Sequence, residues 1–276
     1  MGKGVESDGR DSSDGEARDG HLLVREGPLA SIVLNRPDKL NPLDRRTVAA
    51  LRRSVAELET DSAIRVVQIT GRGKAFSAGG DLEGYQALYR DPEAFRRFLD
   101  DFEALNRAIE DSAKVYMATV NGACVAGGLE LMLACDLVLA AEEAKIADGH
   151  VNFGQLPGAG SSQRLPRTIG PLRAKYLVLT GRTIDGREAE RLGLVTLAVP
   201  WAELEETAAA LAAELAAHSP AGMKGAKYLI NQGLKGGLDE GLALEKAFVH
   251  RYATTEPDAT EGLMAFAEKR RPVYRR

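Results

Sequence analysis

Residues 121–136, NGACVAGGLELMLACD, constrain the fold more than any other part of the chain. They follow a strand-like apolar run at 115–120 and place a glycine pair, Gly127-Gly128, directly before an alanine-rich run of helical character. A glycine pair between a strand and a helix predicts a tight turn with outward-pointing backbone N–H groups, because the first N–H groups of a helix have no acceptor within it. Glu130 is the carboxylate of the first helical turn.

Two further glycine loops follow short apolar strands. The loop GRGKAFSAGGDLEG at 71–84 follows the strand-like run 66–69, and LPGAGSS at 156–162 comes after the apolar run 137–140. Apolar residues at helical spacing separate these strands. This alternation predicts an α/β fold.

The predicted organisation changes twice along the chain. Residues 1–20 are rich in Gly, Ser and Asp and almost free of large apolar side chains, so we expect a disordered tail. We expect the core over residues 21–200. Residues 201–276 are a helical region in which Asp258 is expected to cap the last helix.

Composition excludes several classes of protein. The net charge of −4 over 276 residues, with Lys and Arg scattered, predicts no nucleic-acid partner. No apolar run reaches the length of a membrane span, so no membrane partner is expected. Cys124 and Cys135 both lie in the apolar stretch and are interpreted as reduced thiols, which fits a cytoplasmic protein.

The glycine loops that contain Ala78 and Gly127 suggest a site for a negatively charged oxygen. If the backbone N–H groups of Ala78 and Gly127 converge, they form a pair of donors for an enolate or tetrahedral oxyanion. Glu130 would then lie close enough to act as a general acid or base. From the residues alone two simpler interpretations stay open: the glycines only form tight turns, and Glu130 only interacts with the helix dipole.

Five motifs occur together, in a characteristic order and spacing. They are NRPDKLNPLD at 35–44, GRGKAFSAGGDL at 71–82, NGACVAGGLELMLACDLVLAAEEAKI at 121–146, GQLPGAGSSQRLPRTIG at 154–170 and LTGRTIDGREAERLGLVTLAVP at 179–200. With these motifs the sequence resembles the crotonase, or enoyl-CoA hydratase/isomerase, superfamily. The resemblance extends from about residue 21 to the C-terminus.

The resemblance implies a fold and a substrate. The fold is a crotonase-like spiral of ββα units with a C-terminal helical trimerisation region, giving a homotrimer or a dimer of trimers. The substrate is an acyl-CoA thioester whose oxygen lies between the N–H groups of Ala78 and Gly127. Coenzyme A is present only as part of the substrate, and no permanently bound cofactor or metal is implied.

The resemblance also places the coenzyme A part of the substrate. The implied contacts are Lys39, Leu40, Ala75, Phe76, Asp81 and Leu82, with Phe266 and Lys269 from a neighbouring subunit. Surface lysines in water are an equally simple interpretation of Lys39 and Lys269. Glu83 and Tyr85 are candidates for shaping the acyl pocket.

One position departs from the family pattern. Where hydratases of this family carry a second catalytic glutamate, this chain has His150. An imidazole titrates near neutral pH, so Glu130 and His150 could divide the acid and base roles. A structural histidine, or Asp148 as a substitute acid, are the alternatives, and Ser161 and Ser162 are expected as helix caps.

The predicted activity is that of an enoyl-CoA hydratase or isomerase that stabilises a thioester enolate. The missing glutamate keeps a hydrolase or lyase acting on a β-keto or cyclic acyl-CoA as an alternative. A non-catalytic acyl-CoA-binding subunit is the alternative from a different class of protein.

Overall fold

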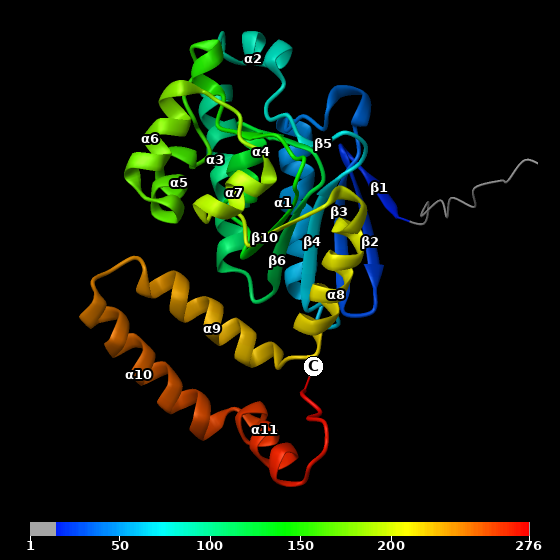
Figure 1. The fold of residues 1–276 in the computed structure, drawn as a ribbon, viewed down its shortest axis with the longest axis vertical. Coiled ribbons are helices and arrows are strands. Elements are labelled where there is room, and N and C mark those ends of the chain that lie inside the picture. Colours follow the sequence, from blue (N-terminus) through cyan, green and yellow to red (C-terminus); the bar gives the residue numbers. More distant parts are fainter. Residues whose placement is uncertain (1–14, 276) are drawn as a thin grey trace, which may run out of the picture.

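Two sheets form the centre of the protein (Figure 1). The computed structural model describes residues 15–275, and within them the larger sheet has the order β1-β2-β3-β4-β6-β8-β10 and the smaller one β5-β7-β9. The strands are β1 (Glu16–Arg18), β2 (His21–Glu26), β3 (Leu29–Leu34), β4 (Val66–Gly71), β5 (Ala75–Ser77), β6 (Val115–Val120), β7 (Ala123–Val125), β8 (Leu137–Ala141), β9 (Ile146–Ala147) and β10 (Leu197–Val199).

Strand direction and burial in the larger sheet follow the sequence pattern. Strands β1 to β3 are antiparallel, and from β3 to β10 every neighbouring pair is parallel. Strand β3 alternates between buried and half-buried positions, whereas all six residues of β6 are buried. A central parallel strand covered on both faces has this continuous apolar character.

The chain passes alternately through the two sheets. It adds β4 and then β5, β6 and then β7, and β8 and then β9. The helices between these pairs are α2 (Leu82–Leu88), α3 (Pro92–Asp111) and α4 (Gly127–Met132). This repeated passage is the predicted spiral of ββα units, and the α/β fold class is confirmed.

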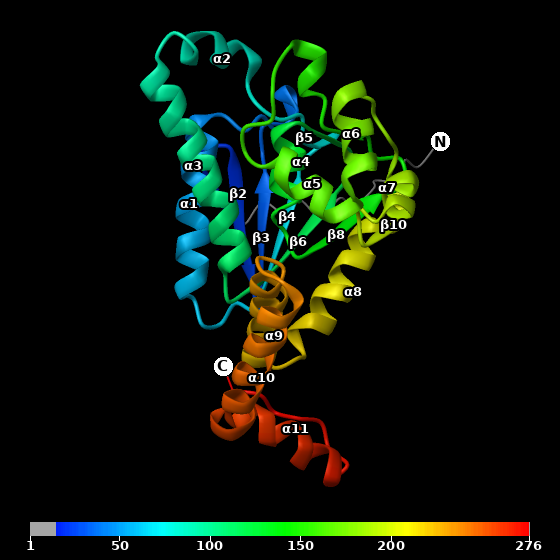
Figure 2. The same cartoon turned by 90° about the vertical axis from the view of Figure 1, so that its left-hand side faces the viewer.

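Helices cover both faces of the larger sheet. Helix α1 (Arg45–Thr60) packs against α3 on one side, and α8 (Leu204–Ala216) packs on β4 and β8 from the other (Figure 2). The Asp44 side chain accepts a hydrogen bond from the N–H of Thr47 and so caps α1. The apolar stripe of α1 is buried because it faces the core.

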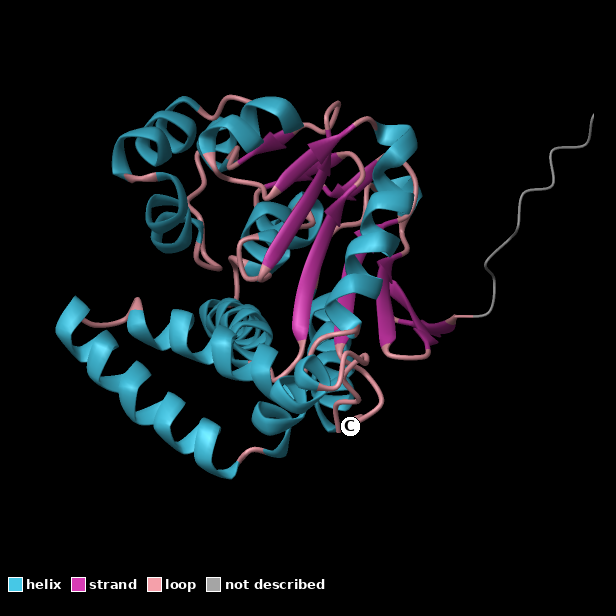
Figure 3. Ribbon diagram, turned by 60° about the horizontal axis from the view of Figure 1, so that its bottom comes forward, coloured by secondary structure: helices cyan, strands magenta, loops and turns pink. Residues whose placement is uncertain are grey.

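The C-terminal helices form an arm that extends away from the sheets (Figures 1 and 3). The arm comprises α9 (Pro220–Gly233), α10 (Leu238–Thr255) and α11 (Pro257–Ala267). No residue of α10 is buried. The remaining helical elements are η1 (Pro37–Lys39), η2 (His150–Phe153), α5 (Ser161–Ile169), α6 (Pro171–Thr180), α7 (Gly186–Leu192) and η3 (Trp201–Glu203).

The structure corrects two predictions about the ends of the chain. Residues 16–18, predicted within a disordered tail over 1–20, form β1 and pair with β2, and Arg18 forms an ion pair with Glu57 at 2.8 Å. The first fourteen residues lie outside the described range. Asp258 does not cap α11: its carboxylate accepts hydrogen bonds from Ser219 Oγ at 2.5 Å and Arg275 N at 3.0 Å.

The two cysteines are free thiols, and the helices of residues 15–275 lack the character of a membrane span. Cys124 and Cys135 are unpaired thiols, as predicted, with Cys124 buried and Cys135 half-buried. Burial raises the pKa of both thiols. Among the helices of residues 15–275, none combines the length and the apolar character needed to cross a membrane.

Candidate active site

The loops that follow β5, β7 and β9 lie at one edge of the smaller sheet. These strands are parallel neighbours, with Ser77 opposite Cys124 and Val125 opposite Ala147. The carboxyl ends of parallel strands lie at the same edge, where open α/β sheets commonly bind ligands. This topology brings residues 78–81, 126–127 and 148–150 together from distant parts of the sequence.

Glycines allow two of these loops to touch. An ideal Cβ on Gly79, whose φ is +91°, would lie 2.7 Å from the carbonyl oxygen of Val125 and 3.0 Å from the nitrogen of Gly127. A Cβ on Gly128 would lie 2.5 Å from the carbonyl oxygen of Ser77. Any larger residue would separate the loops, so the glycines do more than form tight turns.

One predicted backbone donor is already occupied. The N–H of Ala78 donates to the carbonyl oxygen of Leu40 at 2.9 Å, so Ala78 is not a free donor in this structure. Among residues 15–275, no acceptor contacts the N–H of Gly80, two residues further on. The N–H of Gly127 is at the first position of α4 and has no acceptor within the helix. The structure therefore replaces Ala78 by Gly80 as the candidate partner of Gly127.

Glu130 is buried in α4 and held on one side only. Its Oε1 accepts hydrogen bonds from the N–H groups of Ala159, just before α5, at 2.7 Å, and of Ser161, the first residue of α5, at 3.1 Å. Its Oε2 lies 3.8 Å from His150 Nε2. The structure thus leaves one carboxylate oxygen facing His150.

Asp148 holds His150 from the opposite side. His150 Nδ1 lies 3.1 Å from Asp148 Oδ1, and Asp148 Oδ2 accepts a hydrogen bond of 2.5 Å from Ser161 Oγ. Gly160 is at the cap position of α5 and Ser161 is the first residue of the helix, so Ser161 is not the expected helix cap. Its hydroxyl instead positions Asp148. Asp148, Glu130 and His150 form one connected group, which we call the carboxylate–imidazole group.

The pKa values in the carboxylate–imidazole group are displaced in different directions. Burial raises the pKa of Glu130, against the opposing effects of its backbone donors and of His150. Burial alone lowers the pKa of His150, but its hydrogen bond with Asp148 and the nearby carboxylate charges prevail and raise it. The pKa of Asp148 would rise through burial but is lowered overall by its bonds with His150 and Ser161. This arrangement stabilises a protonated His150 between two carboxyl groups.

The carboxylate–imidazole group opens into a cavity of about 410 Å³. Glu130 and His150 both line it, together with Ala78, Gly80 and Ala126 from the two glycine loops. The other lining residues are mainly apolar: Leu40, Leu82, Tyr85, Tyr89, Phe95, Phe98, Leu99, Phe102, Ala123, Val125, Gly149, Phe153, Gln155, Leu156, Gly158 and Ala159. An apolar cavity with a few convergent polar groups is the usual form of a small-molecule site.

Four of the predicted coenzyme A contacts lie at or beside the cavity, and two are buried in β5. Leu40 and Leu82 line it, while Lys39 is exposed in η1 beside Leu40 and Asp81 precedes α2. Ala75 and Phe76 are fully buried in β5 and are not among the lining residues of the cavity, so their predicted contact with coenzyme A depends on backbone atoms and stays a prediction.

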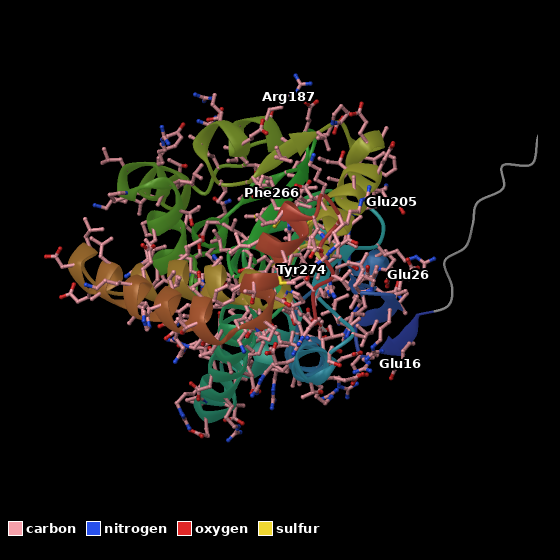
Figure 4. The ribbon with its side chains drawn as sticks, turned by 90° about the horizontal axis from the view of Figure 1, so that it is seen from below. Glu16, Glu26, Arg187, Glu205, Phe266 and Tyr274 are labelled. Carbon is pink, nitrogen blue, oxygen red and sulfur yellow. The ribbon has the colours of Figure 1, made fainter. Side chains whose placement is uncertain are left out.

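Phe266 lies near the end of α11 and Lys269 just beyond it, and Figure 1 shows α11 at the other end of the molecule from α2. Phe266 is labelled in Figure 4. Phe266 is 86% exposed. Within one chain neither residue can reach the cavity, so their role stays a prediction that depends on a neighbouring subunit.

Three features of the site were missed from the sequence. The roles of Gly80 and Ser161 depend on which N–H and hydroxyl groups the fold leaves available, and the sequence signals only small residues in a loop. Ala126 has φ +50° and ψ −117°, a conformation that favours glycine, and nothing in the residue type reveals it.

The winding of ββα units around two sheets, with Glu130 at the edge of the smaller sheet, defines a crotonase-like α/β protein. The family model for enoyl-CoA hydratase/isomerase matches residues 25–276. The chain therefore belongs to the enoyl-CoA hydratase/isomerase family, and it is an enzyme of that family.

Curated relatives and solved structures agree with this assignment. The chain is 38% identical to the "Probable enoyl-CoA hydratase" of Mycobacterium bovis, covering 92% of this chain and 96% of the relative. It is 34% identical to the "Short-chain-enoyl-CoA hydratase" of Clostridium acetobutylicum, covering 91% and 95% of the two chains. An enoyl-CoA hydratase structure from Bacillus anthracis is similar with a TM-score of 0.88 at 36% identity, covering 92% and 98%.

Proposed function

We propose that the protein hydrates an α,β-unsaturated acyl-CoA, with Glu130 and His150 as the acid–base pair. The observation that carries this proposal is the 3.8 Å separation of Glu130 Oε2 and His150 Nε2 in one cavity. Oε2 accepts a proton from a water molecule whose oxygen attacks the β-carbon. The protonated His150 donates its proton to the α-carbon. Transfer of the proton from Glu130 to His150 restores the pair.

Two backbone donors support the charge that develops on the thioester oxygen. As water adds to the β-carbon, electron density moves through the α-carbon to this oxygen and forms an enolate. The N–H groups of Gly80 and Gly127, on adjoining loops, are the proposed donors to it. This arrangement changes the predicted pair, Ala78 and Gly127, at one position.

Glu130→Gln tests the proposal. The amide oxygen of Gln still accepts from the N–H groups of Ala159 and Ser161, so the fold should persist, while the amide NH₂ cannot accept the proton from water. We expect turnover to fall by about 100-fold or more. The loss of conjugated thioester absorbance measures turnover, and calorimetric titration with a saturated acyl-CoA measures binding, which should be unchanged.

Glu214→Gln is the matched control, because Glu214 is exposed on α8 and outside the cavity. Full activity in Glu130→Gln would remove Glu130 from the acid–base role. Tight binding of acyl-CoA without turnover of any unsaturated, β-keto or cyclic acyl-CoA would instead favour a non-catalytic binding subunit.

Double-bond isomerisation is the second candidate, because Glu130 has a single carboxylate oxygen directed at His150 and the pair could shuttle one proton without water. A 3-enoyl-CoA substrate separates the two reactions. Isomerisation produces conjugated absorbance, whereas hydration of a 2-enoyl-CoA removes it.

A further inference from the structure

Five aromatic side chains form one wall of the cavity. This aromatic wall consists of Tyr85 and Tyr89 of α2 and its C-terminal end, and of Phe95, Phe98 and Phe102 of α3. The rings contact one another in series. The centroid separations are 6.1 Å for Phe102–Phe98, 5.9 Å for Phe98–Tyr85, 5.7 Å for Tyr85–Tyr89 and 4.9 Å for Tyr89–Phe95.

Aromatic residues are concentrated at this cavity. The chain contains seven Phe and seven Tyr residues and is only 5% aromatic. Six of these fourteen residues line the cavity, the five of the aromatic wall and Phe153 on the side of His150. Aliphatic side chains would bury an alkyl chain equally well, so apolar burial alone does not account for this concentration of rings.

The aromatic wall begins where the thioester is expected to lie. An ideal Cβ on Gly127 would lie 3.3 Å from Phe102 Cε1, and one on Gly80 would lie 2.1 Å from Tyr85 Oη. From these two glycines the wall extends to Tyr89, which is 43% exposed at the rim. An acyl group that extends outward from the thioester would therefore lie along the rings.

Among the described residues that line the cavity, Glu130 and His150 are the only acidic and basic ones, and both lie at its inner end. At the rim, the hydroxyl of Tyr89 donates to Oε1 of Gln155 and joins the end of α2 to the segment after η2. The space beside the aromatic wall is therefore suited to an uncharged group.

We propose that the acyl group of the substrate carries an aromatic ring, so that the substrate is an aryl-substituted α,β-unsaturated acyl-CoA. This inference rests on the proposed function and names its substrate class. A flat ring conjugated to the enoyl thioester makes offset or edge-to-face contacts with the aromatic wall, beyond the burial of its surface. The wall is also stiff, because each ring has two side-chain torsions and packs against its neighbours.

Binding of two saturated thioesters tests the ring preference without catalysis. We compare 3-phenylpropanoyl-CoA with 3-cyclohexylpropanoyl-CoA by calorimetric titration of the wild-type protein. The cyclohexyl ring is at least as apolar, so a preference for phenyl cannot come from burial alone. We expect phenyl to bind about three- to tenfold more tightly, the gain that an added ring contact provides.

Variants connect this preference to the aromatic wall. Phe98→Leu and Tyr89→Leu should each reduce the phenyl preference towards equality. Tyr89 is at the rim, so its result does not depend on core packing around the buried Phe98. The matched control is Tyr176→Leu, which removes an exposed ring on α6 outside the cavity and should keep the preference.

The outcomes separate this inference from the proposed function. Equal binding of both thioesters, or tighter binding of the cyclohexyl compound, overturns the aryl assignment and leaves the CoA-thioester function intact. A phenyl preference that persists in Phe98→Leu and Tyr89→Leu overturns the role of the aromatic wall. Absence of binding for both thioesters contradicts the proposed function itself.

Discussion

Asp148 is the residue that does most to raise the pKa of His150. Burial alone would lower the pKa of His150, and the contact of 3.1 Å between Asp148 Oδ1 and His150 Nδ1 is the largest influence that raises it. The acid role proposed for His150 requires its protonated form. Activity should therefore extend above the ordinary pKa of histidine and fall as the pH rises through the raised value.

Asp148→Asn tests this dependence. With the Asp148 charge removed, the lowering effect of burial has less opposition, so the pKa of His150 falls and the alkaline limb of the kcat/KM profile moves to lower pH. The acid limb, which reflects Glu130, should remain above the ordinary range of a glutamate, because burial raises its pKa. The two limbs belong to a coupled pair. An alkaline limb identical to that of wild type would contradict the assigned role of Asp148.

Ala126 occupies a strained position at the start of α4. Its φ of +50° and ψ of −117° are sterically unfavourable for a residue with a Cβ. Glycine relieves this strain in the folded state but also increases the conformational entropy of the unfolded chain, which offsets part of the gain. Ala126→Gly should therefore raise the free energy of unfolding by about 1 kcal/mol. Denaturant titration measures this change.

Ala209→Gly is the control for Ala126→Gly. Ala209 is exposed within α8, so glycine there should lower the free energy of unfolding by about 1 kcal/mol. Destabilisation of similar size at both positions would show that the backbone of Ala126 is not strained.

At the scale of elements, Lys227 fastens α9 to the body of the protein. Its Nζ forms an ion pair of 2.8 Å with Asp136 Oδ2 and donates to the carbonyl oxygens of Ile109 and Lys114. Burial raises the pKa of Asp136, and the charge of Lys227 opposes this shift. One lysine thus joins α9 to the end of α3, to the start of β6 and to the residue before β8.

Lys227→Met removes these contacts and leaves the Asp136 carboxylate without its cation. We expect the free energy of unfolding to fall by about 3 kcal/mol, measured by chemical denaturation. The double variant Lys227→Met/Asp136→Asn should recover part of this loss, because it no longer contains an unpaired buried charge. Equal stability of the single variant and wild type would show that the contact does not hold the arm.

For the whole molecule, the C-terminal arm carries exposed apolar side chains that one chain does not cover. Leu238, Leu242 and Val249 on α10 and Leu263 on α11 are between 48% and 78% exposed. Exposed apolar surface of this kind is typical of a protein–protein interface. We therefore expect these helices to contact other copies of the chain in a trimer or a dimer of trimers.

Light scattering coupled to size exclusion tests this assembly. The expected mass is three or six times that of the 29.6 kDa chain. Leu263→Glu should dissociate the assembly by introducing a charge into the interface, and Leu263→Met should preserve it. A wild-type mass equal to one chain would contradict the assembly.

Much of the fold followed from local pattern. The strand before Gly127, the helices with apolar stripes and the glycine loops are short-range features, and the structure contains them near the predicted positions. The end of the predicted tail was wrong, because β1 depends on pairing with β2, a contact that composition does not reveal. Asp258 was misassigned as a cap for the same reason, since its partners Ser219 and Arg275 are distant in sequence.

The sequence by itself determined the family, the order of the ββα units and the candidates Glu130, Gly127 and His150, because these depend on residue type and spacing. Only the tertiary structure decided three facts about the site: the Ala78 N–H is occupied while that of Gly80 has no acceptor among residues 15–275, Ser161 positions the Asp148 carboxylate that holds His150, and six aromatic rings line one cavity. These facts depend on which atoms of three loops and two helices meet. A contact between distant segments has no signature in either segment alone.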